Sequence, residues 1–577
     1  MIFSSATPED TSNVHERDDG DGGDGENQTL TTQPEEEHVY PQGLALVLII
    51  ASVLLSVFFV ALDRTVLSVA IPKITDRFHS LDDVGWYGSS YLLTNCSSQL
   101  LFGRIYKFYN TKWVVVNCIV IFELGSALCG AAPSSVCFII GRAIAGLGSA
   151  GIFAGGMMTI YYAVPLGKRP VYTGLFGATF GVASVIGPLI GGVLTDKLTW
   201  RWCFFLNLPI GGAALAIIVL ILKLPDPTGE KLPLRQQLVQ LDPLGTAVFL
   251  PSMVCLILAL QWGGTTYAWS SWRMILLLTL FSVLIVIFAA TQALKGDSGT
   301  LPPRILFQRS IAGGAYFTFC VSAGWLLIIQ YLPIWFQAIK GTSALDAGIH
   351  FIPTVLALVL AGILGGKSTQ AIGYYVPVMF LGPALASVGS GMLSTLKQNS
   401  GHAMWIGYQV IVGLGLGIGM QVSGLAAQAV LPQEDVSIGT AIMMFSQQLG
   451  GAIFVSVGQN VFFNDLISTL SDIPGLDTAI ILNTGATDLQ KTIPARYLTQ
   501  VLAKYNHALT RTFIISTGML AASILGSCFM EWKNIKTSKK PTGGPAARET
   551  VDLKKKKGET GDKEKAVQES KAETHVV

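Results

Sequence analysis

The chain has 577 residues, of which 51% are hydrophobic and only 13% are charged. An ordinary soluble domain carries roughly 25% charged residues, so this composition excludes a water-soluble globular protein. The formal net charge of +2 is too small to indicate nucleic-acid binding. The eight cysteines lie in or beside apolar runs without metal-like spacing, which predicts small core side chains rather than a metal site or a disulfide framework.

Charged residues concentrate at the two ends of the chain. Residues 1–43 hold eleven Asp and Glu residues against the single Arg17, and residues 531–577 are rich in lysine, including the run Lys554 to Lys557. Neither segment has enough apolar side chains to form a core. We therefore expect two disordered tails, an acidic one and a basic one.

Successive apolar runs between the tails are long enough to cross a bilayer, which takes about 20 residues. We count fourteen, at about 44–63, 84–103, 113–132, 136–160, 173–194, 203–223, 244–262, 273–294, 311–336, 349–366, 374–395, 405–430, 438–462 and 512–530. The pattern predicts an all-α membrane protein with fourteen transmembrane helices. The runs near 84 and 311 are polar enough that we expect them to be buried among other helices.

The distribution of Lys and Arg predicts the orientation, because basic residues are retained in cytoplasmic loops. With the N-terminus inside, the inner loops and their edges hold twelve basic residues and the outer loops eight, leaving out the long polar segment 463–511. The even number of spans agrees, so both termini are expected to be cytoplasmic. The lysine-rich tail then lies beside the anionic inner leaflet, which attracts such residues at about 1 kcal/mol per charge, or merely keeps the chain solvated.

Two strings within the spans depart from a plain apolar helix. GVASVIGPLIGG at 181–192 places Gly181, Gly187, Pro188, Gly191 and Gly192 in one span, which favours close helix approach or bending at the proline; tight packing alone is the alternative.

The string IIGRAIAGLGSAG at 139–151 places Arg142 inside the fourth span. An arginine at mid-membrane costs about 3 kcal/mol, so it requires a partner in the bundle interior, unless its side chain reaches the membrane edge.

These strings, together with LDRTVLSVAIPKI at 62–74, WRWCFFLNLPIG at 200–211 and YLPIWFQAIKGTSALDAG at 331–348, resemble the fourteen-span drug:proton antiporters of the major facilitator superfamily. The resemblance covers about 44–530 and looks closest to fungal efflux pumps, which confer multidrug resistance or export mycotoxins and other secondary metabolites. It implies two six-span bundles, 44–223 and 311–530, with two spans inserted between them at 244–294. In this family a Gly/Pro-rich fifth span accompanies export by antiport.

One loop departs from the superfamily pattern. Where a glycine, an aspartate and basic residues are expected, the chain has GRIYKFYNTKW at 103–113, with Lys107 at the position of the acid. A charge relay in this loop is therefore in doubt, but Gly103, Arg104 and Lys112 remain candidates for a cytoplasmic gate.

Two acidic residues in or beside the spans are candidates for proton coupling. Glu123 lies among apolar neighbours in the third span, and Asp63 ends the first span next to Arg64. Either could carry the proton, with Arg142 stabilising the charged form. For Asp63, a structural ion pair with Arg64 or a helix-capping role is an equal alternative.

A cavity for amphipathic molecules should be apolar and aromatic, with a few polar groups. The side chains of that kind within the spans are Trp86, Tyr87, Tyr91, Gln99, Asn207, Gln330, Trp335, Gln337, Gln421, Gln447 and Gln448. Membrane-interface belts and hydrogen bonds between helices use the same residue types.

No motif indicates an enzyme, a cofactor or a bound metal. AGILGGKS at 361–368 lacks the first glycine of a phosphate-binding loop, and the chain has neither HExxH nor GxSxG. We therefore expect a proton-coupled exporter of small organic molecules in the plasma membrane, or alternatively the vacuolar membrane. Its expected partners are substrate, protons and membrane lipid. A proton-coupled importer, such as a siderophore carrier, and a non-transporting sensor remain alternatives.

Overall fold

The computed structural model describes most of the chain between the two tails. The described residues are 40–79, 83–222, 233, 241–264, 266–471, 473 and 489–536. Within these ranges the chain is helical, and its β-type pairings are two isolated bridges. The lysine run 554–557 and most of both expected tails lie outside the described residues.

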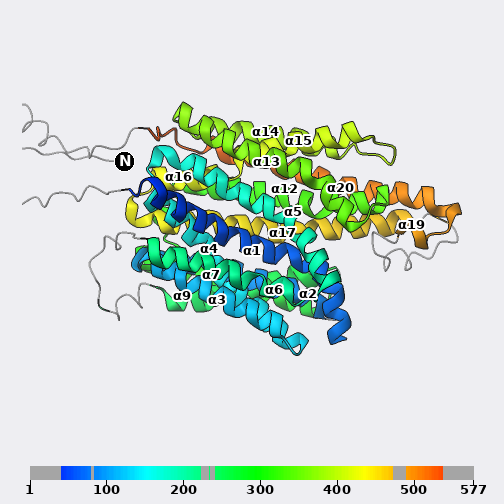
Figure 1. The fold of residues 1–577 in the computed structure, drawn as a ribbon, viewed down its shortest axis with the longest axis horizontal. Coiled ribbons are helices and arrows are strands. Elements are labelled where there is room, and N and C mark those ends of the chain that lie inside the picture. Colours follow the sequence, from blue (N-terminus) through cyan, green and yellow to red (C-terminus); the bar gives the residue numbers. More distant parts are fainter. Residues whose placement is uncertain are drawn as a thin grey trace, which may run out of the picture. The chain divides into compact units, whose positions relative to one another are not determined.

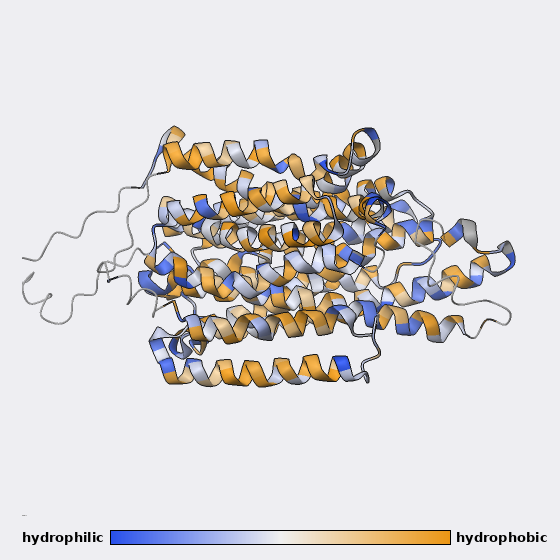
Figure 2. Cartoon of the chain, turned by 90° about the horizontal axis from the view of Figure 1, so that it is seen from below, coloured by the Kyte–Doolittle hydropathy of each residue, from blue (hydrophilic) through white to orange (hydrophobic). Residues whose placement is uncertain are grey.

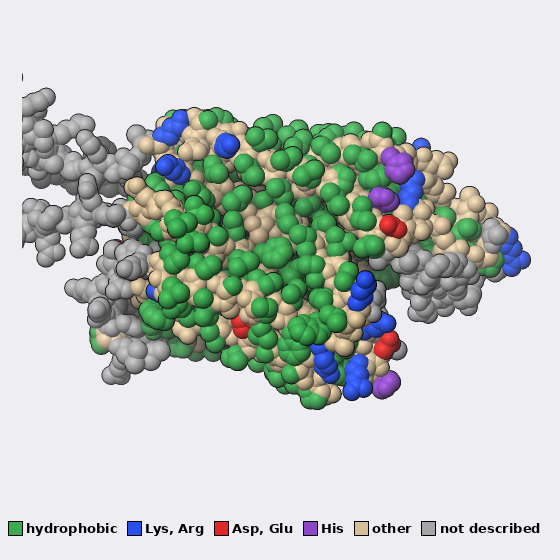
Figure 3. All heavy atoms as spheres, viewed as in Figure 1, with side chains coloured by type: hydrophobic (Ala, Val, Ile, Leu, Met, Phe, Trp, Pro, Cys, Tyr) green, Lys and Arg blue, Asp and Glu red, His purple; other side chains and the backbone are tan. Residues whose placement is uncertain are grey.

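The helices form an elongated stack of parallel and antiparallel rods (Figure 1). In lipid, every backbone polar group must be paired within the protein, which apolar sequences achieve by forming helices. Among the described residues, thirteen helices are long and apolar enough to cross a membrane. Hydrophobic side chains cover the middle of the surface in Figure 3, and Lys, Arg and His gather toward the two ends. Figure 2 shows that hydrophobic residues predominate along most of the helices.

The first bundle is built from six helical segments. They are α1 (Gly43–Phe78), α2 (Val84–Phe108), α3 (Thr111–Ala131), α4 (Ser135–Ala163), α5 (Arg169–Lys197) and the pair α6 (Trp202–Phe205) and α7 (Asn207–Ile221). Helix α4 packs against α2 and α3, while α1 packs against α5 and α7. Small residues at these contacts let the helix backbones approach closely.

The second bundle repeats this arrangement after the short α11 (Pro303–Leu306). Its helices are α12 (Arg309–Lys340), α13 (Ala344–Ile372), α14 (Val376–Leu393), α15 (His402–Gly419) with α16 (Val422–Val430), α17 (Val436–Leu470), and α20 (Ala495–Cys528) preceded by α19 (Leu489–Thr492). Helix α12 packs against α17 and α20, and α13 packs against α15. The start of α1 and the chain segment that follows α20 lie at the same end of the bundles (Figure 1), which we call the terminal side.

Two helix pairs join the bundles. Helix α5 packs against α13, and α2 packs against α17. A hairpin of α9 (Pro243–Trp262) and α10 (Trp272–Lys295) is inserted between the bundles in sequence, and α9 lies against both α2 and α17. The hairpin therefore covers one of the two seams between the bundles.

Asp242 anchors the hairpin at the terminal side. Its carboxylate is fully buried and accepts hydrogen bonds from Gln292, Lys295, Thr300 and the backbone N–H of Gly245. Burial alone would raise the pKa of this carboxyl, but these donors outweigh it and hold the pKa well below its usual range. The aspartate thus links the start of α9 to the end of α10.

Helix α2 explains the difference between fourteen expected spans and thirteen apolar ones. Its 25 residues include too many polar side chains for it to count among the thirteen apolar helices. The hydroxyl and amide side chains of α2 are buried against α4, α9 and α17. Ser90, Asn95 and Gln99 are among these buried residues. Packing on three sides replaces contact with lipid, as expected for the run near 84.

Two expected boundaries are wrong. The segment expected as a polar loop at 463–511 is helical at both ends, because α17 continues to Leu470 and α20 begins at Ala495. Val501 and Leu509 bury one face of α20 in the second bundle's core, which stabilises the extension. The start of the tail expected to be disordered from 531 is ordered: Ile535 is buried and its N–H donates to the carbonyl of Gly373.

The contact between α3 and α4 depends on glycine. A Cβ atom at Gly148 would lie 2.6 Å from the backbone nitrogen of Phe122, so Gly148→Val should force the helices apart. Overpacking of this kind costs about 1–3 kcal/mol. Thermal unfolding of purified protein should show a lower Tm than wild type. Gly212→Val, at an exposed position with no atom within 4 Å, should leave Tm unchanged; an equal loss in both variants would contradict the close contact.

Candidate functional site

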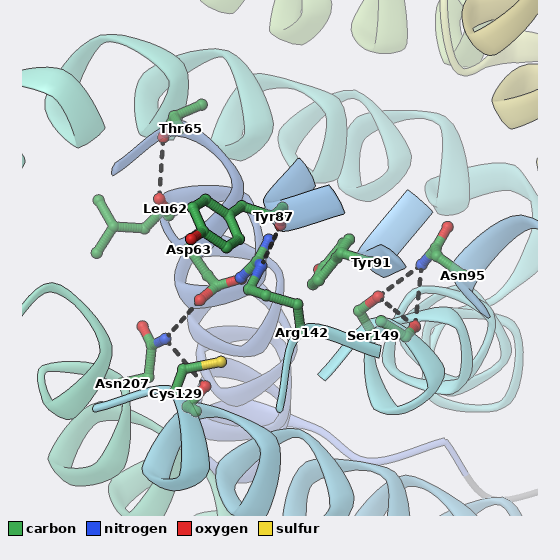
Figure 4. A network of polar contacts seen from close by, with 12 residues as sticks. Leu62, Asp63, Thr65, Tyr87, Tyr91, Asn95, Cys129, Arg142, Ser149 and Asn207 are labelled. Carbon is green, nitrogen blue, oxygen red and sulfur yellow. Dashed lines mark hydrogen bonds and ion pairs between the residues drawn. The ribbon is translucent and has the colours of Figure 1, made fainter. Parts of the chain in front are cut away.

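A buried ion pair lies in the first bundle, in the half away from the terminal side. Arg142 Nη1 is 2.5 Å from Asp63 Oδ2, and both side chains are at most 1% exposed. The pair joins α1 to α4 (Figure 4). Arg142 thus has the interior partner that the cost of a mid-membrane charge requires.

Amide and hydroxyl groups complete the hydrogen bonding of the pair. Asn207, at the start of α7, donates to Asp63 Oδ1 at 3.2 Å and to Ser126 Oγ at 3.2 Å. Arg142 Nε donates to the backbone carbonyl of Tyr87 at 3.1 Å. Together these bonds connect α1, α2, α3, α4 and α7. Hydrogen bonds and ion pairs of this kind are strengthened in a low-dielectric interior and hold these helices in one relative geometry.

Tyr91 connects the ion pair to a second arginine. Its ring centroid lies 4.4 Å from Arg142 Cζ and 5.4 Å from Arg64 Cζ. Arg64 does not pair with its neighbour Asp63, whose oxygens face Arg142 and Asn207. The alternative of an Asp63–Arg64 pair is therefore not what the structure contains.

Glu123 lies on α3, one turn from Ser126, which is a rise of about 4.5 Å. Both of its carboxylate oxygens are buried and have no hydrogen-bond partner among the described residues. They pack against α7, where a Cβ atom at Gly211 would clash with Oε1. The absence of a side chain at Gly211 makes room for this carboxyl group.

The glycine-rich segment of α5 contacts α1 in the first bundle and α13 in the second. Gly187 lies against the side chain of Thr65 and Gly191 against Val66, both on α1, whereas Gly181 faces Leu358 of α13. Pro188 lies within α5, and a Cβ atom at Gly192 would meet nothing within 4 Å. Helix α5 thus holds the Asp63 segment on one side and the second bundle on the other.

A cavity of about 50 Å³ lies between the bundles. Four glutamines line it with aromatic side chains, two methionines and one cation. The lining residues are Arg64, Gln99, Phe153, Phe176, Phe180, Ser322, Trp325, Leu326, Met420, Gln421, Met444, Gln447 and Gln448. Four of the residues selected from sequence, the glutamines 99, 421, 447 and 448, thus meet in one place.

The other residues selected for the cavity lie elsewhere. Tyr87, Tyr91 and Asn207 belong to the network around the ion pair. Trp86 makes an edge-to-face contact with Trp262, and Trp335 Nε1 donates a hydrogen bond to Asn506 Oδ1. Gln330 is exposed and Gln337 is half-buried.

A second ionic network connects the bundles at the terminal side. Asp435, at the end of η4 (Gln433–Asp435), accepts from Lys107 at 3.1 Å and from Arg304 at 2.8 Å. Arg304 also contacts Asp297 at 3.1 Å, and Arg104 Nη2 donates to the carbonyl of Asp297 at 2.8 Å. The network joins α2, the connection after α10, and the start of α17.

The three residues selected for a gate have different positions. Arg104 belongs to the terminal-side network. Gly103 lies at the seam, where a Cβ atom would come within 2.6 Å of Ala441 on α17. Lys112 instead donates to the carbonyl of Val219 on α7, within the first bundle.

Sequence reasoning missed Asp435, Asp297 and Arg304 in this network, and Trp325 and the three phenylalanines in the cavity. Asp435 follows directly on Glu434 in a short polar connection. The one indication in the sequence is Lys107, a basic residue where an acid is expected, which suggests an acidic partner in another part of the chain. The aromatic residues resemble ordinary core side chains in sequence.

The fold and its buried polar network define a multi-pass membrane protein. The family model of the Major Facilitator Superfamily matches residues 53–455. The chain belongs to this superfamily, whose members are transporters.

Curated relatives agree with this assignment. The chain is 52% identical over 529 residues to the MFS-type efflux pump MFS1 of Arthroderma benhamiae, covering 90% of this chain and 98% of the relative. It is 48% identical over 501 residues to the rubrofusarin-specific efflux pump aurT of Gibberella zeae, covering 87% and 92%. It is 46% identical over 513 residues to the efflux pump aflT of Aspergillus parasiticus, covering 88% and 100%. The expected resemblance to fungal efflux pumps is confirmed.

Solved structures support the fold. The fucose:proton symporter FucP of E. coli superposes with a TM-score of 0.54 at 12% identity, covering 85% of this chain and 100% of the symporter. The proton:xylose symporter XylE gives a TM-score of 0.53, also at 12% identity, covering 85% and 98%.

The ion pair should be stabilising only as a pair. Arg142→Met leaves the Asp63 carboxylate buried without its cation, which costs about 3–5 kcal/mol. The double variant Asp63→Asn/Arg142→Met removes both charges and should have a higher Tm than Arg142→Met alone. Arg201→Met is the control, because it removes an arginine that donates to the carbonyl groups of Gly130 and Ala132 and has no carboxylate partner among the described residues. Additive losses in the double variant would show that the two side chains act independently.

Asp435 should hold the terminal-side seam closed. Asp435→Asn weakens two charge-assisted contacts, so backbone amides in the first turns of α17 should exchange with deuterium several-fold faster. Glu434→Gln changes the exposed neighbouring acid and should leave the exchange unaltered. Equal exchange in wild type and Asp435→Asn would show that the network does not restrain this seam.

Proposed function

We propose that the protein is a proton-coupled exporter of small amphipathic organic molecules. One observation carries the proposal: a cavity lined by aromatic side chains and glutamines lies between the two bundles, next to a buried carboxylate–arginine pair. The names of the relatives, efflux pumps including a rubrofusarin-specific one, support the direction of transport. The substrate would be a drug, toxin or other secondary metabolite.

In this proposal α2 is the fourteenth span, and both termini are cytoplasmic. Its 25 residues are long enough to cross the bilayer, and its polar side chains face other helices. The terminal side then faces the cytoplasm, in agreement with the excess of basic residues in those loops. Export from the cell places the protein in the plasma membrane. The domain limits of 44–223, 244–294 and 311–530 follow from the same assignment.

Transport by this architecture requires the bundles to move relative to each other. Ligand pockets have volumes of about 300–1,000 Å³, so the cavity of about 50 Å³ is too small for such a substrate until the bundles separate. The glycine contacts of α5 provide smooth surfaces for rocking. The terminal-side network of Lys107, Asp435, Arg304, Asp297 and Arg104 acts as the cytoplasmic gate and is closed in this conformation.

Glu123 and Asp63 carry the coupling proton in this mechanism. Within the described part of the chain, Glu123 has no hydrogen-bond donor or paired cation to stabilise a negative charge, and binding a proton removes that charge from the membrane interior. Asp63 is paired with Arg142, and binding of a proton to Asp63 releases the arginine. Each proton thus changes the bonds among α1, α3, α4 and α7.

Glu123→Gln should abolish export driven by a pH gradient without abolishing insertion into the membrane. Glutamine has nearly the same shape but cannot bind or release the proton. The assay measures accumulation of a panel of labelled hydrophobic compounds in cells with and without the protein, before and after the proton gradient is collapsed. Wild type should lower accumulation only while the gradient exists.

Asp76→Asn, at an exposed position near the far end of α1, is the control and should behave as wild type. Unchanged export by Glu123→Gln would overturn the assignment of Glu123. Higher accumulation in cells with wild-type protein would overturn export in favour of import.

A further inference from the structure

Arg64 is the one cation among the described residues that line the central cavity, and none of those residues is acidic. Its Nη2 is 3.4 Å from Gln448 Oε1, and its guanidinium lies near the ring of Tyr91. Among the described residues, no carboxylate lies within 4 Å of the guanidinium nitrogens. The Asp63–Arg142 pair is internally satisfied, so the positive charge of Arg64 is left for the cavity.

The walls of the cavity are aromatic on both sides of the seam. Phe153 contacts Phe176 and Phe180 in the first bundle, with ring centroids 5.8 and 6.2 Å apart. Trp325 faces the cavity from the second bundle and is braced by Phe351, at 6.2 Å and an interplanar angle of 25°. Aromatic rings stack favourably on flat aromatic ligands at such spacings.

Two buried polar atoms at the cavity have no partner among the described residues. Trp325 Nε1, on a side chain that is 1% exposed, is a donor without an acceptor, and Gln99 Oε1, on a side chain that is 0% exposed, is an acceptor without a donor. Buried polar atoms are normally paired, because an unpaired one costs free energy. These atoms are therefore suited to hydrogen bonds with a bound molecule.

We propose that the cavity binds flat aromatic molecules that carry a hydrogen-bond-accepting oxygen and no positive charge, with Arg64 as the recognising group. The guanidinium donates to a carbonyl or hydroxyl oxygen of the ligand, the aromatic walls stack on its rings, and Trp325 Nε1 donates to a second oxygen. An organic cation is repelled, because no acid in the cavity offsets Arg64. This inference rests on the proposed function, since it assigns the substrate class of the same cavity.

The test uses the full-length protein in lipid nanodiscs and three fluorescent probes with the same ring system. The probes are 9-anthracenecarboxamide, which has an acceptor oxygen, 9-methylanthracene, which has none, and 9-(aminomethyl)anthracene, which is a cation. Binding is measured by fluorescence anisotropy against empty nanodiscs. Wild type should bind the carboxamide about tenfold or more tighter than the methyl compound, as expected for a hydrogen bond to a charged group, and should bind the cation most weakly.

Arg64→Gln should reduce the preference for the carboxamide to about threefold or less and should strengthen binding of the cation. Arg64→Lys keeps the charge and should retain part of the preference. Arg273→Gln, which removes an exposed arginine outside the cavity, should match wild type. These matched variants separate recognition by Arg64 from a general effect of losing an arginine.

The proposal is overturned if wild type binds the cation as tightly as the carboxamide, or if Arg64→Gln leaves the preference unchanged. If Arg64→Gln does not fold, the relative affinities of the three probes for wild type and for Arg64→Lys still test the proposal. Efflux from cells separates this proposal from the proposed function. Absent efflux with an intact, Arg64-dependent preference would contradict export alone, whereas efflux without that preference would contradict the role of Arg64 alone.

Discussion

The pairing of Arg142 with Asp63 is the interaction on which the first bundle depends. A lone arginine or aspartate in the membrane interior is costly, and the two together satisfy each other at 2.5 Å. Their remaining hydrogen bonds go to Asn207 and to the backbone of Tyr87, so one ion pair fixes the relative positions of α1, α2, α4 and α7. The same pairing frees the side chain of Arg64 for the cavity.

Glycine determines how closely the other elements approach this centre. Gly187 on α5 brings that helix against Thr65, which follows directly on Asp63 and Arg64, while Gly181 brings it against α13. Helix α5 therefore contacts both the charged centre and the second bundle. At the terminal side, Gly103 and the ions around Asp435 join the bundles through a different helix pair, α2 and α17. The proposed coupling between proton and substrate thus has two physical connections available.

Much of the fold follows from apolar run length, because lipid forces those runs into helices. The sequence also predicts that Arg142 has a partner in the bundle interior. It does not indicate whether Asp63 pairs with its neighbour Arg64 or with Arg142 on another helix. Adjacent residues on a helix point about 100° apart, which is why Asp63 and Arg64 face different surroundings. The acid that meets Lys107 lies 328 residues away, and no local pattern connects such positions. The helical ends of 463–511 could not be predicted because these segments are polar on average, although one face of each helix is buried.

The two arginines and one aspartate of this centre have an electrical consequence. The guanidiniums of Arg64 and Arg142 and the carboxylate of Asp63 leave one net positive charge at this centre. Moving one charge through a full potential of 100 mV changes the free energy by about 2.3 kcal/mol. Any rocking of the first bundle that carries this centre through part of the field therefore makes the balance between its two orientations depend on membrane voltage. In the proposed mechanism a proton on Asp63 doubles that charge, so voltage and pH act on the same movement.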